Sequence, residues 1–475
     1  MSLTLPLENT YSGLPPRLFA RQDPTPVAAP RLLALNDALA GDLGLDPSGL
    51  RTEEGVAALS GNAVPPGATP ISQAYAGHQF GGWVPQLGDG RAVLLGEVVA
   101  PDGRRMDLQL KGAGRTPYSR SGDGRAWLGP VLREYVVSEA MHALGVPTTR
   151  ALAAVATGET VFREAPLPGA VLARVASSHV RVGTFQFLYA REDVEGLQAL
   201  ADHVIARHYP EAGDVFGLLD AVVSAQAGLI ARWMGVGFVH GVMNTDNMSI
   251  AGETIDYGPC AFVDGYHPDA VFSSIDRFGR YAYARQPEIA VWNLAQFATS
   301  LLPLMGEREA AIERATDLVN DFGPRFQAAW LAIFRAKLGL TEAADDDAAL
   351  AGDLLDLMAR DRADFTKVFR GLADGTAGDW ITDRPAFDLW RERWRERRGR
   401  EDAGPEAQER LMGRSNPAVI PRNHHVEAVI AAALEGDLDL FHEMCRATTQ
   451  PFVDHPQFGT PPEPGDEVTR TFCGT

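Results

Sequence analysis

The sequence predicts an α+β fold in which a small lobe containing a β-sheet precedes a larger, helical lobe. Between about residues 86 and 176, short apolar segments are separated by turns, a pattern typical of antiparallel strands. Beyond about residue 194, apolar residues recur at helical spacing in one segment after another. The chain has 475 residues, of which 45% are hydrophobic and 22% charged, so it can bury such a core and is not mainly disordered.

Changes of pattern along the chain divide it into four segments. Residues 1–85 are rich in Pro, Gly and Ala, and we expect them to form an N-terminal extension packed on the core. Residues 86–192 are predicted to form the small lobe and residues 193–305 the larger lobe. Residues 306–475 are expected to form a C-terminal helical extension.

The first elements can be predicted from periodicity and turn residues. A helix is expected from Arg31 to about Leu43, because Gly44 and then Pro47 follow it. The segments RAVLLGEVVA and MDLQLKG, joined by the turn PDGR, predict a β-hairpin.

A helix and further strands complete the predicted small lobe. Pro130 can occupy an early helical position, and the following VLREYVVSEAMHAL has helical spacing until Gly145 and Pro147. The segments ALAAVAT, VFRE and AVLARVA are strand-like and extend the sheet to about residue 176.

Charge and cysteine content exclude several classes of protein. The net charge of -19 opposes general binding to nucleic acid or to anionic membranes, so any polyanion must meet a local basic segment. Three cysteines are too few for a disulfide framework and lack zinc-site spacing. The N-terminus has no signal-peptide pattern and no uninterrupted apolar stretch approaches membrane-spanning length, so we expect a cytoplasmic protein. We also expect a monomer.

The turn GDGR precedes the predicted hairpin, and Lys111 ends the hairpin's second strand. A glycine-rich turn that includes Gly88, Gly90 and Arg91 lets backbone N–H groups approach phosphate oxygens, which a Lys at a strand end can also reach. The order resembles the Gly-rich loop and strand lysine of the protein-kinase architecture. The alternative is an ordinary hairpin turn with a solvated lysine.

Residues 104–125 form a basic segment in this acidic chain, with six arginine or lysine residues against two aspartates. Interleaved glycines keep its backbone open, so it can wrap around an anion; the alternative is a mobile surface loop. On the helix that follows, Glu134 is the candidate for the ion pair that positions a phosphate-binding lysine in kinase-like folds, with Glu139 as its rival.

Phosphate chemistry is further indicated by HGVMNTDNMSI followed by IDYG. Two strands joined by the turn AGE would bring Asn247 and Asp256 together, and their oxygens suit a divalent metal. The arrangement matches a kinase catalytic loop and its DFG motif.

One part of the kinase pattern is missing from this sequence. A kinase carries its catalytic-base Asp two residues after the corresponding His. Here Val242 occupies that position after His240, and valine cannot accept a proton from a hydroxyl. Asp246 is the available replacement, and the alternative is that it only forms the turn in NTDN.

Taken together, the blocks GDGR, KGAGRTPYSRSGDGRA, LREYVVSEAMHALGVPTTRAL, HGVMNTDNMSI, DYGP and NPAVIPRN resemble the selenoprotein O (SelO or YdiU-type) family of protein nucleotidyltransferases over most of the chain. The resemblance implies a protein-kinase-like two-lobed fold that binds ATP head-to-tail relative to ordinary kinases. AMP, with UMP as an alternative, then passes to Ser, Thr or Tyr hydroxyls of protein substrates, and pyrophosphate leaves.

The resemblance also implies roles for individual residues. Asp246 is the proton acceptor, and Asn247 and Asp256 hold Mg²⁺ or Mn²⁺. The residues expected to contact the nucleotide are Gly88, Gly90, Arg91, Lys111, Asp123, Gly124, Arg174, Arg181 and Asp256.

Some relatives are expected to pair a C-terminal Cys with a Cys in the loop after DYG as a redox latch. Here Cys473 lies near the C-terminus and Cys260 directly follows DYGP, whereas Ser273 and Ser274 stand in the later loop. Pairing of Cys473 with Cys260 or with Cys445 is left open.

Two rivals to nucleotidyl transfer remain at this point. One is ordinary γ-phosphoryl transfer, which Val242 disfavours. The other is a nucleotide-sensing scaffold without turnover, which would need the nucleotide contacts but not Asp246.

Overall fold

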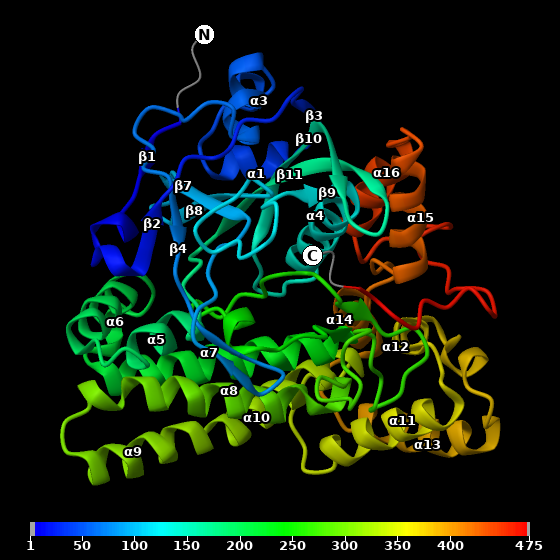
Figure 1. Cartoon of the computed structure of the whole chain (residues 1–475). Coiled ribbons are helices and arrows are strands. Elements are labelled where there is room, and N and C mark those ends of the chain that lie inside the picture. Colours follow the sequence, from blue (N-terminus) through cyan, green and yellow to red (C-terminus); the bar gives the residue numbers. More distant parts are fainter. Residues whose placement is uncertain (1–4, 473–475) are drawn as a thin grey trace.

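A large antiparallel β-sheet covered by helices forms the first part of the molecule, and helices dominate the rest (Figure 1). The computed structural model describes residues 5–472. The strands of the large sheet are β1 (Leu7–Glu8), β2 (Phe19–Arg21), β3 (Arg31–Leu35), β4 (Ile71–Gln73), β7 (Ala92–Val99), β8 (Arg105–Lys111), β9 (Ala126–Trp127), β10 (Arg150–Phe162) and β11 (Pro166–Ala176). Their order is β2-β4-β7-β8-β11-β10-β3, with β1 on β7 and β9 on β11. The predicted α+β class is confirmed.

Two small two-stranded sheets lie outside this large one. They pair β5 (Gly77–Gln79) with β6 (Gly82–Val84), and β12 (Phe238–Val239) with β13 (Ala261–Phe262). The α-helices are α1 (Asp37–Asp42), α2 (Pro47–Leu50), α3 (Glu53–Ser60), α4 (Leu128–Ala143), α5 (Val182–Tyr189), α6 (Val194–His208), α7 (Val215–Gly235), α8 (Gln286–Leu301), α9 (Arg308–Asn320), α10 (Phe322–Lys337), α11 (Asp347–Asp361), α12 (Phe365–Asp374), α13 (Arg384–Arg398), α14 (Pro405–Ser415), α15 (Asn423–Leu434) and α16 (Asp439–Thr448).

The predicted hairpin is confirmed as β7 and β8. Its register pairs Ala92 with Lys111, so the residue that follows the GDGR turn lies beside the lysine at the end of β8. Leu108 and Leu110 alternate along β8 and are buried, as period-two patterning requires. The next predicted helix is also confirmed, as α4, and Gly145 follows it in the left-handed conformation.

The helix expected from Arg31 to about Leu43 is wrong in its first half. Residues Arg31–Leu35 form strand β3 at the edge of the sheet, paired antiparallel with β10. Asn36 then caps α1, since its side chain accepts a hydrogen bond from the Leu39 amide. Pairing with β10 satisfies backbone groups of this segment, and that long-range contact overrides the helical spacing of its leucines.

The two strands expected on either side of the AGE turn are also wrong. Thr245–Asn247 forms a single 3-10 turn, and the backbones of Ser249 and Thr254 make isolated bridges with Arg181 and Thr148. The segments flanking the turn therefore pair with chain from before residue 182 and not with each other. This pairing fastens the loop to the sheet-containing part of the molecule.

Helix α7 lies in the centre of the helical part. Its length and mean hydropathy of 1.4 would allow it to cross a membrane, but 56% of that stretch is buried inside the protein. It packs against α8, α9 and α10, so its apolar character is that of a core helix and fits a soluble protein.

The C-terminal helices return to the sheet-containing part, where α15 and α16 lie beside α4 (Figure 1). The rings of Tyr135 on α4 and Phe441 on α16 meet edge to face, with centroids 5.5 Å apart. The N-terminal segment contributes as well, because β1, β2, β3 and β4 belong to the large sheet. The kinase-like arrangement and the domain boundaries stay predictions.

Candidate active site

Three cations converge on the carboxylate of Asp256. Lys111 Nζ lies 2.9 Å from Oδ1, and Arg174 Nη1 lies 2.7 Å from the same oxygen. Arg181 Nη1 lies 2.6 Å from Oδ2. Arg174 and Arg181 are almost fully buried, so these are enclosed ion pairs and not surface contacts.

Glu134 is the partner of Lys111, with Nζ and Oε2 2.6 Å apart, as the order of residues predicts. Arg174 Nη1 also lies 3.2 Å from Glu134 Oε1. The rival Glu139 instead binds Arg150, at 2.7 Å, and is not part of this cluster. The lysine–glutamate pair therefore joins the end of β8 to α4.

Strand register explains why these side chains meet. β8 and β11 are neighbours, with Lys111 opposite Leu172 and Gln109 opposite Arg174. Gln109 and Lys111 are two residues apart on β8, so they point to the same face of the sheet. Arg174 Nη2 donates a hydrogen bond of 2.5 Å to Gln109 Oε1, which holds the guanidinium over that face.

The electrostatics of the cluster favour a charged Asp256. Burial alone would raise the pKa of Asp256, but Lys111, Arg181 and Arg174 hold it well below its ordinary value. Asp256 also has a φ of 65°, in the left-handed region that residues other than glycine seldom adopt. Such backbone strain is concentrated at functional positions.

Asp246 lies next to this cluster and shares Arg181 with it. Arg181 Nη1 donates to the Asp246 backbone oxygen at 2.6 Å as well as to Asp256 Oδ2. The Asp246 side chain is buried, and Gln79 Nε2 donates to its Oδ2 at 3.1 Å. Burial raises the pKa of Asp246 to about 6, although the Gln79 hydrogen bond opposes the shift. A carboxylate of that pKa can accept a proton near neutral pH.

Asn247 follows Asp246 but makes no hydrogen bond to Asp256 among the described residues; its Nδ2 donates to the Val242 oxygen at 3.0 Å. Within residues 5–472 there is no group of three or more His, Cys, Asp or Glu side chains that could hold a metal. An amide oxygen and a carboxylate are nevertheless hard ligands of the type that Mg²⁺ and Mn²⁺ prefer. Both Asp256 oxygens are engaged by cations in this structure, so a metal would compete with those contacts.

The GDGR turn is packed against the basic segment. A Cβ at Gly88, which has a φ of 129°, would lie 2.5 Å from the Tyr118 ring, and one at Gly90 would lie 2.9 Å from the Tyr118 oxygen. The backbone amide of Gly112 donates a hydrogen bond of 2.7 Å to the backbone oxygen of Arg91. Both glycines are therefore required by close packing in this structure, whatever they do for a ligand.

Asp123 and Gly124 lie in the same basic segment but outside the Asp256 cluster. The Asp123 carboxylate pairs with Arg163 at 2.8 Å. Gly124 accepts a hydrogen bond from the Gly114 amide at 3.0 Å, and a Cβ there would lie 2.1 Å from Gly114 backbone. These contacts close the segment into a loop.

Three side chains at the site were missed by reasoning from the sequence: Gln109, Gln79 and Tyr75. Gln109 could have been found, because it shares a strand face with Lys111. It also links the cluster to the GDGR turn, since its Nε2 donates to Asp89 Oδ2 at 3.2 Å. Tyr75, whose ring centroid lies 4.7 Å from Arg181, and Gln79 carry no signal of spacing or composition.

The cysteines show no pairing within the described residues. Cys260 is free and buried, and burial raises the pKa of its thiol; Cys445 is also free. Cys473 lies outside the described residues, so its predicted pairing stays open.

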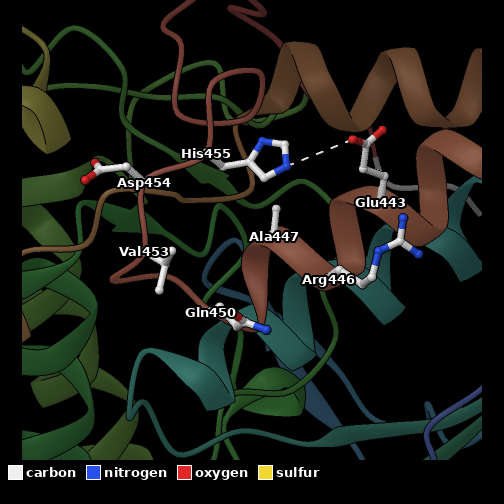
Figure 2. A pocket seen from close by; sticks show the side chains of 7 residues that line it. All are labelled: Glu443, Arg446, Ala447, Gln450, Val453, Asp454 and His455. Atoms are coloured by element: carbon white, nitrogen blue, oxygen red, sulfur yellow. Dashed lines mark ion pairs between the residues drawn. The ribbon is translucent and has the colours of Figure 1, made fainter.

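A surface pocket lies elsewhere, along α16 and the segment after it (Figure 2). It has a volume of about 220 Å³ and includes Glu443 and His455, whose facing atoms are 4.0 Å apart. None of its lining residues belongs to the Asp256 cluster, so we do not assign the nucleotide to it.

Comparison with known proteins gives one consistent result. A family model described as "Protein adenylyltransferase SelO" matches residues 2–449. A "Protein nucleotidyltransferase YdiU" of Ruegeria sp. (strain TM1040) is 60% identical, with all of both chains covered. Proteins of the same description from Jannaschia sp. (strain CCS1) and Bradyrhizobium diazoefficiens are 59% and 57% identical, covering 99% and 100% of each chain.

Proposed function

The chain belongs to the SelO family of protein adenylyltransferases and is a nucleotidyltransferase, and on that premise we propose how its site performs the transfer. ATP binds with its triphosphate over the basic face of the sheet and its α-phosphorus beside Asp246. The acceptor is a Ser, Thr or Tyr hydroxyl of a protein substrate. The proposal includes a kinase-like two-lobed arrangement, with lobes at residues 86–192 and 193–305.

The observation that carries the proposal is the three-cation cluster on Asp256, joined to Asp246 through Arg181. Buried cations already assembled at one carboxylate can bind triphosphate oxygens with little reorganisation. The phosphates take over the contacts of Lys111 and Arg174, which frees Asp256 oxygens. Asp256 and Asn247 would then hold Mg²⁺ or Mn²⁺, which offsets negative charge on the phosphates.

The proposed reaction balances as follows. The acceptor oxygen forms a bond to the α-phosphorus while the bond from that phosphorus to the bridging oxygen of the β-phosphate breaks. Pyrophosphate leaves with the electron pair of that bond. The hydroxyl proton passes to the Asp246 carboxylate, which is buried and whose raised pKa of about 6 suits a proton acceptor near neutral pH.

Labelled nucleotide tests the assignment directly. The protein is incubated with a mixture of acceptor proteins and ATP labelled at the α- or at the γ-phosphate. We expect α-label on protein, released pyrophosphate, and loss of labelling in Asp246→Ala. Retained γ-label would instead indicate a kinase, and ATP binding without either label would indicate a scaffold. UTP labelled at the α-phosphate measures whether UMP is transferred as an alternative to AMP.

A further inference from the structure

Asp246 is covered by the β5–β6 hairpin, which no motif or family resemblance brought into the site. The first residue of the hairpin, Gly77, lies against the Asp246 side chain, and a Cβ there would lie 2.5 Å from Oδ1. Gly77 does not have the positive φ that would call for glycine. Space for the Asp246 carboxylate is therefore the physical reason for a glycine at this position.

The two oxygens of Asp246 have different surroundings. Oδ2 accepts the hydrogen bond from Gln79 Nε2, at 3.1 Å. Oδ1 is buried and has no hydrogen-bond partner within the described residues. An unpaired buried carboxylate oxygen is costly, and such an atom is expected to have a partner during function.

The hairpin is fastened to the loop that carries Asp246. The backbone amides of His78 and Phe80 donate to Thr245 Oγ1 at 2.7 Å and to Asn244 Oδ1 at 3.0 Å. Gln186 accepts a hydrogen bond from Thr245 Oγ1 at 2.6 Å and contacts His78 Nδ1 at 2.9 Å. These four contacts fix the hairpin relative to the loop, so Gln79 approaches Asp246 from a rigid support.

We propose that Gln79 is a positioning residue for nucleotidyl transfer: it holds Asp246 Oδ2, so that Oδ1 is the atom that receives the hydroxyl proton. The inference rests on the proposed role of Asp246 as base. It specifies further that Oδ1 is the oxygen that reacts and that Gln79 is the side chain that orients the carboxylate. Gln79 itself touches neither the nucleotide nor the acceptor in this scheme.

The test compares Gln79→Met, which keeps the length of the side chain and removes the donor, with Gln198→Met. Gln198 makes the matched contact on the surface, donating at 2.8 Å to Asp202 on the same helix. A hydrogen bond to a charged group of this kind corresponds to roughly a 10- to 100-fold effect. We expect Gln79→Met to lower kcat by about that factor with the KM for ATP unchanged, and Gln198→Met to match the wild type.

A double-mutant cycle separates positioning from a general structural effect. If Gln79 acts only through Asp246, Gln79→Met should leave the residual α-label transfer of Asp246→Asn unchanged. Further loss in the double variant, or a raised KM for ATP in Gln79→Met, would overturn the inference.

The outcomes also separate this inference from the proposed function. Wild-type kcat in Gln79→Met together with loss of transfer in Asp246→Asn overturns the inference alone. Wild-type transfer in Asp246→Asn overturns the assignment of the base. If Gln79→Met does not fold, Gly77→Ala gives a second measurement, since its Cβ displaces the same carboxylate from the Oδ1 side. It should lower kcat at unchanged KM for ATP, and wild-type kcat there would count against the inference.

Discussion

The carboxylate of Asp256 is the centre of the ion pairs at this site. Lys111, Arg174 and Arg181 surround its carboxylate, and Glu134 supplies the second negative charge. Asp89 and Asp246 are further buried carboxylates close enough to act on Arg181, so the cations stay charged although they are buried. Buried charges of this kind are costly unless they are paired, so each cation here depends on its carboxylate partners.

Replacing Asp256 tests this balance. We expect Asp256→Ala to abolish nucleotidyl transfer and to lower the free energy of unfolding by about 3–5 kcal/mol, because buried cations lose their partner. Denaturant titration and the α-label assay measure the two effects. Asp220→Ala is the control, since it removes a carboxylate from a partly exposed pair with Arg325 and should cost less than about 1 kcal/mol. Wild-type stability in Asp256→Ala would contradict the account.

Some of these residues could be predicted and others could not. The order of GDGR, Lys111, Glu134 and Asp256 indicated a phosphate site, and the structure brings the last three together. Arg174 and Arg181 were indicated only by the family resemblance, because an isolated arginine in a sequence carries no information about its partner. Strand pairing between β8 and β11 supplies that information.

At the scale of elements, α4 is held from two sides. Lys111 of β8 binds it at Glu134, and α15 and α16 pack along it. Arg133, the neighbour of Glu134, donates to Asn423 Oδ1 of α15 at 3.1 Å and also to the backbone oxygen of Cys260. The C-terminal helices thus help to fix the helix that carries the glutamate partner of Lys111.

Arg422, just before α15, connects the start of this helix to other parts of the chain. Its buried guanidinium lies 2.7 Å from Asp364, the N-cap of α12, and contacts Asp264, in the chain after β13. Arg422→Met leaves two largely buried carboxylates without a cation, so we expect the free energy of unfolding to fall by about 3–5 kcal/mol. Chemical denaturation measures it. Arg393→Met, which breaks an exposed pair, should cost less than about 1 kcal/mol; equal effects would refute the connection.

The packing of α10 against α12 gives a prediction about pH. Lys337 is buried with its Nζ 4.3 Å from the centre of the Phe369 ring, and burial lowers the pKa of Lys337 from 10.5 to about 7. Between pH 7 and pH 10.5 the unfolded chain binds more protons at Lys337 than the folded chain does, so the free energy of unfolding rises with pH. Below about pH 7 Lys337 is charged in both states, and the full free-energy cost of burying its charge applies.

Lys337→Met should therefore stabilise the protein in a pH-dependent way. We expect a gain of about 2 kcal/mol at pH 6.5, because the buried charge is removed, and a much smaller gain near pH 10. Thermal or denaturant unfolding at the two pH values measures the difference. A gain that is the same at both would show that the charge of Lys337 is not its cause.

At the scale of the whole molecule, charge is distributed unevenly. The chain has a net charge of -19, yet residues 104–125 are basic and contribute Lys111 to the Asp256 cluster. We therefore expect a small polyanion to bind at this basic segment and an extended one to be repelled by the acidic remainder of the chain.

This distribution predicts selectivity between polyanions. We expect ATP to raise the melting temperature of the protein, since binding to the folded state stabilises it. We expect no binding to a short DNA duplex at low salt in a gel-shift assay. DNA binding that weakens steeply as salt is added would contradict the predicted selectivity.

Local patterns in the sequence were enough to predict the α+β class, the β7–β8 hairpin, α4 and the order of the phosphate-site motifs, because these depend on periodicity, turn residues and nearby charges. Three features could be established only from the folded protein: Arg31–Leu35 is an edge strand, Glu134 and not Glu139 pairs with Lys111, and Gln79 contacts Asp246. Each of these depends on contacts between residues far apart in the chain, whose free energy exceeds local preference and leaves no periodic trace in the sequence.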